Sequence, residues 1–281
     1  MVLSIGPIMV MEVIHMEERK KAIGLLDSGV GGLTLVREFN RLLPGENIVY
    51  FGDTARMPYG PKGPEEVRSY ATEIIEFLAS TQDIKLMIVA CNTATAVGLS
   101  YYQARFSFPV LGVLEPGAQA ALDKSQTRRI GVIGTEATIA SKAYPNAILA
   151  MDKGAKVFDK ACPLFVLLVE NQLIDTPEAY KIAQSYLEPL LQQGIDTLIL
   201  GCTHYPLMEH VLAAVTGEQA ALVNSAQYTA LAARKTLSEK GLLNAEKRGW
   251  QRFFVSGEPR NFEVIGGRLL GYDIKAYRVL F

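Results

Sequence analysis

Residues 85–93 read KLMIVACNT, and residues 196–204 read DTLILGCTH. Each stretch is a short apolar run, then a small residue, then a cysteine followed by hydrogen-bonding side chains. An apolar run of this length bounded by polar residues is typical of a buried parallel strand. Because ligands of open α/β sheets bind at the carboxyl ends of such strands, the pattern predicts that Cys91 and Cys202 lie where chemistry is done. Two thiols facing one cleft can take a proton from one face of a substrate and return one to the other.

Strand-like and helix-like segments alternate along almost the whole chain. This alternation predicts an α/β fold of parallel sheets with helices on both faces. The pattern restarts between residues 115 and 134, which indicates two similar halves with one thiol in each. A return of the C-terminal segment to the first half is expected near Asn224.

The composition is that of an ordinary globular protein: of 281 residues, 49% are hydrophobic and 20% charged, with a net charge of −1. This charge favours neither a nucleic-acid nor a membrane partner. Three cysteines without disulfide-like spacing fit a reducing cytoplasm. Residues 1–14 are apolar but too short to span a bilayer, and their positive charge follows them, which is the wrong order for a secretory signal. We interpret residues 1–21 as a loosely held extension or an upstream choice of start site.

Two loops follow the first two expected strands. In the sequence DSGVGG at residues 27–32, the glycines allow close approach of a ligand to the backbone, and Asp27 is in position to act as a base, a base-orienting group or an ammonium binder. The second loop, residues 52–61, is rich in turn-forming residues, and Tyr59 and Gly60 can offer a hydroxyl and a backbone N–H to a carboxylate. The alternative for the first loop is a tight strand-to-helix turn, and for the second it is a loop held open by prolines.

The residues after each cysteine favour a reactive site. Cys91 lies at an expected helix start, where the helix dipole lowers the pKa of a thiol. Asn92 and Thr93 follow it and can hydrogen-bond a substrate carboxylate. Cys202 has the same placement, and His204 can pass a proton to or from its thiol, or orient it.

Two further residues, Glu170 and Cys162, are considered as site candidates. Glu170 ends an apolar stretch, and a partly buried acid there can assist a neighbouring histidine. Cys162 has no polar cluster after it, so a structural role is favoured. The sequence contains no C-x-x-C pair and no H-E-x-x-H motif, so no metal site is expected.

Several motifs together carry a family resemblance: LDSGVGG at 26–32, PYG at 58–60, ACNTA at 90–94, EPG at 115–117, GVIGT at 131–135 and GCTHYP at 201–206. They resemble glutamate racemase, within the aspartate/glutamate racemase superfamily, and the similarity runs from about Ala22 to Gly257. A related decarboxylase branch keeps only one of the two cysteines, so the retained pair argues for racemisation.

The resemblance implies a cofactor-independent racemase of L- and D-glutamate that supplies D-glutamate for peptidoglycan synthesis, as a cytoplasmic homodimer. It implies two pseudo-symmetric α/β domains, each a mostly parallel sheet flanked by helices, with the active site in the interdomain cleft. The chain would begin in one domain, pass through the second and return. The expected first domain is residues 22–114 plus 225–281, and the second is residues 115–224.

The resemblance also implies residue roles. Cys91 would act on the α-proton of the D-isomer with support from Asp27, and Cys202 on that of the L-isomer with support from His204. The family's substrate-contacting positions match Asp27, Ser28, Tyr59, Gly60, Asn92, Thr93, Thr203 and His204.

Two alternatives stay open on the sequence alone. The same chemistry can serve aspartate or another amino acid, and a non-catalytic two-lobed amino-acid-binding protein can share the cleft without needing both thiols. Racemisation predicts that replacing either cysteine with alanine abolishes activity. It also predicts that replacing Asp27 and His204 slows the two directions unequally.

Overall fold

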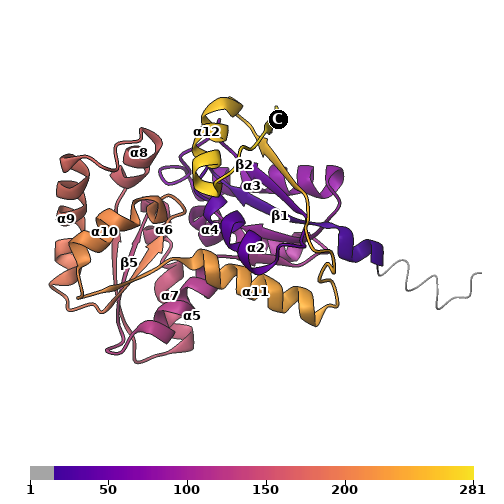
Figure 1. Cartoon of the computed structure of the whole chain (residues 1–281). Helices are drawn as coiled ribbons and strands as arrows, with labels where there is room; N and C mark the ends of the chain where they lie inside the picture. The colour runs from indigo at the N-terminus through magenta and orange to yellow at the C-terminus, as the bar shows by residue number, and fades with distance from the viewer. Residues whose placement is uncertain (1–15) are drawn as a thin grey trace, which may run out of the picture.

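The computed structural model describes residues 16–281 and consists of two parallel β-sheets flanked by helices (Figure 1). The predicted α/β class is therefore confirmed. Part of the predicted extension, residues 1–15, lies outside the described residues. Residues 16–20 are helical, and they contact the first domain: Arg19 Nε donates to the carbonyl of Gly241 at 2.9 Å, and Asn47 Nδ2 donates to that of Lys20 at 2.6 Å.

The first sheet has the strand order β10-β9-β2-β1-β3-β4, and every pairing in it is parallel. Its strands come from two separate parts of the chain: β1 (Ala22–Asp27), β2 (Ile48–Gly52), β3 (Ile84–Val89) and β4 (Val110–Gly112), then β9 (Gln251–Val255) and β10 (Ala276–Arg278). The central strands β1, β2 and β3 are buried along their whole length, as their unbroken apolar runs predict.

Helices cover both faces of this sheet. One face packs against α2 (Leu33–Leu42), α11 (Ser225–Glu239) and α12 (Pro259–Leu270), and the other against α3 (Pro64–Thr81) and α4 (Asn92–Arg105). Alternate residues of β1 point to the two layers: Ile23 and Leu25 to the first, Ala22 and Leu26 to the second.

The second sheet has the order β6-β5-β7-β8 and is also parallel. Its strands are β5 (Arg129–Gly134), β6 (Lys156–Ala161), β7 (Thr197–Gly201) and β8 (Ala221–Val223). One face packs against α8 (Leu164–Glu170), α9 (Pro177–Leu191), the 3₁₀ turn η1 (Tyr205–Met208) and α10 (Glu209–Thr216). The other packs against α5 (Leu114–Lys124) and α7 (Ala143–Met151), and the short α6 (Glu136–Ala140) follows β5.

The chain leaves the first sheet after β4, builds the second, and returns through α11 to β9 (Figure 1). Helix α11 contacts both α2 and α5, so it joins the two halves. The boundaries at residues 114 and 225 remain a prediction. Among residues 16–281, no helix is both long and apolar enough to cross a membrane.

A buried ion pair and two further hydrogen bonds join four segments of the chain, at Arg19, Glu46, Lys85 and Leu242. Lys85 Nζ lies 2.6 Å from Glu46 Oε2, and the two side chains are 0% and 1% exposed. The ammonium group also donates to the carbonyls of Arg19 and Leu242. Burial lowers the pKa of Lys85, and the bond to Glu46 opposes that shift. The ammonium group is therefore held by one carboxylate and two backbone carbonyls.

Replacing Lys85 with methionine is expected to lower the free energy of unfolding by about 3–5 kcal/mol, because it leaves the Glu46 carboxylate buried without its cation. Urea unfolding of the variant measures the loss. Lys235→Met is the matched control, since Lys235 pairs with Glu239 on the exposed surface of α11 and should cost less than about 1 kcal/mol. An equal loss of unfolding free energy in both variants would show that the buried Lys85–Glu46 pair stabilises the protein no more than the exposed pair does.

Candidate active site

The carboxyl ends of the central strands of the two sheets face each other and are in direct contact. Thr203 Oγ1, beyond β7, donates to Asp27 Oδ1, at the end of β1, over 3.1 Å. Close packing at this point requires glycine at position 31, because a Cβ there would lie 2.5 Å from the carbonyl carbon of Thr203. The two sequence motifs that hold Asp27 and Thr203 are thus brought together.

Cys91 is the residue that immediately precedes α4, and it is 4% exposed. Its Sγ lies 3.8 Å from Ser28 Oγ. Burial raises the pKa of the Cys91 thiol to about 12, and the negative charges of Asp27 and Cys202 add to the rise. The predicted net lowering of this pKa was therefore wrong: loss of hydration raises it by more than the N–H of Ala94, at the start of α4, lowers it. Asp27 is also bonded to Thr203, the residue after Cys202, so both thiols border the contact between the two domains.

Asp27 is fully buried and accepts hydrogen bonds from three donors. Its carboxylate receives the backbone N–H of Gly29 at 3.2 Å and of Gly32 at 2.9 Å, and the Thr203 hydroxyl at 3.1 Å. The Tyr50 hydroxyl lies 3.3 Å from the carboxylate but donates over a shorter distance, 2.8 Å, to the carbonyl of Gly29. The three bonds to Asp27 fix the position of its carboxylate. The backbone at Gly29 and Gly32, predicted to allow close approach of a ligand, instead donates its N–H groups to Asp27.

Cys202 belongs to a chain of three polar side chains in the second domain. Its Sγ lies 3.8 Å from His204 Nδ1, and His204 Nε2 lies 2.6 Å from Glu170 Oε1, at the end of α8. Burial by itself lowers the pKa of His204, but the bonds to Cys202 and Glu170 outweigh it and raise the pKa well above the ordinary value. The two ring nitrogens connect Cys202 with Glu170, so His204 is in position to exchange a proton with Cys202.

Hydroxyl groups of both domains meet beside Cys91. Thr93 Oγ1 lies 2.9 Å from Thr135 Oγ1 and 3.3 Å from Thr138 Oγ1, and all three side chains are buried. The sequence pattern did not single out Thr135 or Thr138 as site residues. The N-cap role of Thr135 could have been predicted, because a threonine between a strand and a helix is a typical N-cap. Its hydroxyl does accept the N–H of Thr138 at 3.2 Å.

Asn92 is held by a tyrosine of the opposite domain that no sequence motif singles out. The hydroxyl of Tyr144, on α7, donates to Asn92 Oδ1 at 2.8 Å. Gly117 and Gly201 leave room for this ring, since a Cβ at either position would lie 3.2 Å or less from its atoms. The bond orients the Asn92 amide so that its N–H₂ group faces away from Tyr144.

Tyr59 and Gly60 lie beside these hydroxyls. The Tyr59 hydroxyl donates to Asp53, so it is occupied within the first domain rather than free for a ligand. Gly60 packs against Thr135, where a Cβ would lie 2.8 Å from the threonine Cβ, and its carbonyl accepts the N–H of Ala137 at 3.2 Å. The loop therefore contributes backbone atoms to the domain contact.

The cavity beside Cys202 is small in this structure. It measures about 10 Å³ and is lined by residues of both domains, including Asn92, Cys202 and Thr203. Such a volume holds about one water molecule. An amino acid does not fit this cavity in the conformation described.

Cys162 lies outside this cluster. It is fully buried in the apolar core of the second domain, where burial raises the pKa of its thiol. In the part of the chain that the structure describes, no group of three or more His, Cys, Asp or Glu side chains is arranged to hold a metal ion.

A thiol on each side of a two-domain cleft, each with its own polar partners, can act on opposite faces of one carbon atom, which is the arrangement that a racemase needs. A family model described as Asp/Glu/hydantoin racemase matches residues 23–233. The chain belongs to this family. Its relatives place it with the glutamate racemases.

Three relatives show the extent of the similarity. The glutamate racemase of Geobacter metallireducens is 48% identical over 89% of this chain and 93% of its own length. A glutamate racemase of Bacillus anthracis superposes with a TM-score of 0.90 at 44% identity, covering 93% of this chain and 98% of that one. The glutamate racemase of Francisella tularensis, solved in complex with D-glutamate, gives a TM-score of 0.87 at 32% identity, covering 94% and 98%. These matches agree with the fold and with the resemblance carried by the sequence motifs.

Proposed function

We propose that this protein interconverts L-glutamate and D-glutamate by proton transfer between two cysteines, without a cofactor. The observation that carries the proposal is the pair of thiols in one interdomain site, Cys91 next to Asp27 and Ser28, and Cys202 next to His204. Similarity over most of the chain to glutamate racemases, one of them solved with D-glutamate, supports the choice of substrate.

The proposed reaction conserves protons and needs no redox partner. With L-glutamate, the thiolate of Cys202 takes the α-proton as the Cα–H bond breaks, and the thiol of Cys91 delivers its proton to the opposite face of Cα. The high pKa of Cys91 keeps it protonated at neutral pH, which is the state that this direction requires. D-glutamate reacts by the reverse sequence.

The α-proton of an amino acid is a very weak acid, so the charge left on the substrate needs stabilisation. Closure of the domains excludes water, and fixed donors then act strongly on the developing charge. Asn92 and Thr93 are the proposed donors to the substrate carboxylate, with Thr203, Ser28 and the backbone of Gly60 beside them. Asp27 is held by three donors and is suited to receive the substrate ammonium group as well as to influence Cys91.

The wider role follows from this reaction. D-glutamate made in the cytoplasm would serve peptidoglycan synthesis, and we propose a homodimer as the working assembly.

The test is a polarimetric assay of the purified protein with L-glutamate and, separately, D-glutamate, with no cofactor added and with the same reaction repeated in ²H₂O. The proposal predicts loss of optical rotation from either isomer and solvent deuterium at Cα of the inverted product. Binding of glutamate without inversion would instead identify a binding protein. Faster inversion of aspartate would assign the site to another substrate, and an inverted product free of deuterium would exclude proton exchange.

The pair of His204 and Glu170 predicts a pH effect on this reaction. Glu170→Gln removes a carboxylate that raises the pKa of His204, so the ring should lose its proton at lower pH. The alkaline limb of the kcat profile with L-glutamate should then move to lower pH. Asp175→Asn is the matched control, because Asp175 pairs with His210 at 2.8 Å on the exposed surface and its loss should leave the profile unchanged. If the alkaline limb of Glu170→Gln does not move, His204 takes no part in the proton transfer.

A further inference from the structure

A second cavity lies on the first domain, at the amino ends of the strands, whereas the cysteines lie at the carboxyl ends. It measures about 540 Å³, within the usual range of small-molecule sites. Gln251, one of its lining residues, is the first residue of β9, whereas Cys91 follows the carboxyl end of β3. A five-residue strand spans roughly 17 Å, so the cavity is separate from the reaction site.

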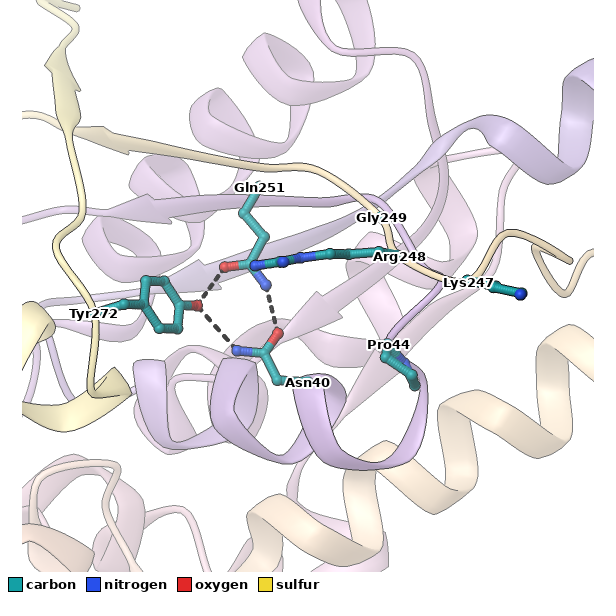
Figure 2. Close-up of a pocket in the computed structure, with 7 residues that line it drawn as sticks. All are labelled: Asn40, Pro44, Lys247, Arg248, Gly249, Gln251 and Tyr272. Atoms are coloured by element: carbon teal, nitrogen blue, oxygen red, sulfur yellow. Dashed lines mark hydrogen bonds between the residues drawn. The ribbon is translucent and has the colours of Figure 1, made fainter.

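A closed ring of three polar side chains forms one wall of this cavity (Figure 2). Asn40 Nδ2 donates to the Tyr272 hydroxyl at 2.9 Å, the hydroxyl donates to Gln251 Oε1 at 2.6 Å, and Gln251 Nε2 donates to Asn40 Oδ1. The ring uses one N–H of each amide group. Since an amide NH₂ carries two donors, Asn40 and Gln251 each keep one oriented N–H for a ligand.

Two cations complete the lining, Lys247 and Arg248, and the lining includes no carboxylate. Both are exposed, and neither pairs with an acidic side chain of residues 16–281. Figure 2 shows Arg248 extended along the cavity toward the ring, while Lys247 points outward at its edge.

The cavity walls are held rigidly by bonds between two loops. The N–H of Gly249 donates to the carbonyl of Pro44 at 2.8 Å, and that of Trp250 donates to Asn47 Oδ1 at 3.0 Å. Gly249 packs so closely against the Glu46 carbonyl that no Cβ fits there. The site is therefore preformed, which lowers the cost of ordering it around a ligand.

We propose that this cavity binds a small phosphate-bearing molecule. The available groups are two amide N–H donors, a guanidinium and an ammonium, so the complementary ligand is an anion. Four donor groups around one cavity suit a phosphate group, with three or more acceptor oxygens, better than a carboxylate with two. The volume leaves room for the organic part of a phosphate ester beyond the anion itself.

The only tryptophan of the chain reports on this site. Trp250 lies between Gly249 and Gln251, which both line the cavity, and its side chain is 41% exposed. Titration of the full-length protein with pyrophosphate at constant ionic strength, followed by tryptophan fluorescence and by calorimetry, should give a saturable transition. Saturating glutamate should not abolish the pyrophosphate transition, because the cavity is outside the reaction site.

Three variants make the test specific. The double variant Lys247→Ala/Arg248→Ala should weaken pyrophosphate binding by about tenfold or more through loss of charge-assisted bonds. Tyr272→Phe keeps every charge but breaks the ring, so it should also weaken binding. Lys153→Ala/Lys181→Ala removes two exposed lysines of the second domain and should bind like the wild type.

Several results would overturn the proposal: no saturable signal by either method, equal weakening in the two double variants, wild-type binding by Tyr272→Phe, displacement by glutamate, or tighter binding of citrate than of pyrophosphate. Because the readout is binding without turnover, the outcome is independent of whether the protein racemises glutamate.

Discussion

Cys91→Ala and Cys202→Ala should each lower kcat for glutamate inversion by about 10²–10⁴-fold, the usual contribution of a positioned acid or base. Each variant keeps one thiol on one face of the substrate, so a proton removed from that face has no acid opposite to replace it. Polarimetry of both variants, starting from each isomer, measures the loss. Full activity in either one would end the two-cysteine mechanism.

An isotope experiment separates this mechanism from a general loss of structure. In Cys91→Ala, Cys202 can still remove the α-proton of L-glutamate and return a solvent deuteron to the same face, so labelled L-glutamate should form without inversion. Cys202→Ala should show the same behaviour with D-glutamate. Cys162→Ala is the control for removal of a buried thiol, since Cys162 lies in the core of the second domain. Under conditions in which this variant is folded, it should invert glutamate at the rate of the wild type.

The sequence contained enough information to predict the fold class and the positions of both thiols. The apolar runs before Cys91 and Cys202 become β3 and β7, and both cysteines border the domain contact because the carboxyl ends of the two sheets face each other. The polar neighbours Asp27 and His204 were also visible, because each lies at the end of a strand or directly after a cysteine motif. Their assigned roles remain predictions, which substitution of each residue tests.

Contacts across the cleft were not predictable, because they depend on how the two domains pack. Nothing in the sequence near Tyr144 indicates that its hydroxyl reaches Asn92, which is 52 positions earlier in the chain. The pKa of Cys91 was mispredicted for a similar reason. The helix start is visible in the sequence, whereas the degree of burial, which has the larger effect, is set by the closed domains.

Asp27→Asn and His204→Asn should slow the two directions of the reaction unequally. His204 contacts Cys202, so its loss should reduce kcat from L-glutamate most, by about 10²-fold. The Asp27 charge raises the pKa of Cys91, so its loss should lower that pKa and make the Cys91 thiolate a weaker base. This should slow mainly the direction in which Cys91 removes the proton, from D-glutamate. The Asp27 variant should also raise KM, because the carboxylate is the proposed partner of the substrate ammonium group.

The inequality must appear in kcat and not in kcat/KM. The two enantiomers have equal free energy in water, so kcat/KM is the same in both directions for every variant, and KM has to change along with kcat. Primary isotope effects with α-deuterated L- and D-glutamate then identify the slowed step. The effect should grow for the L-isomer in His204→Asn and for the D-isomer in Asp27→Asn. Equal growth for both isomers would mean that these side chains hold the site together without serving one thiol each.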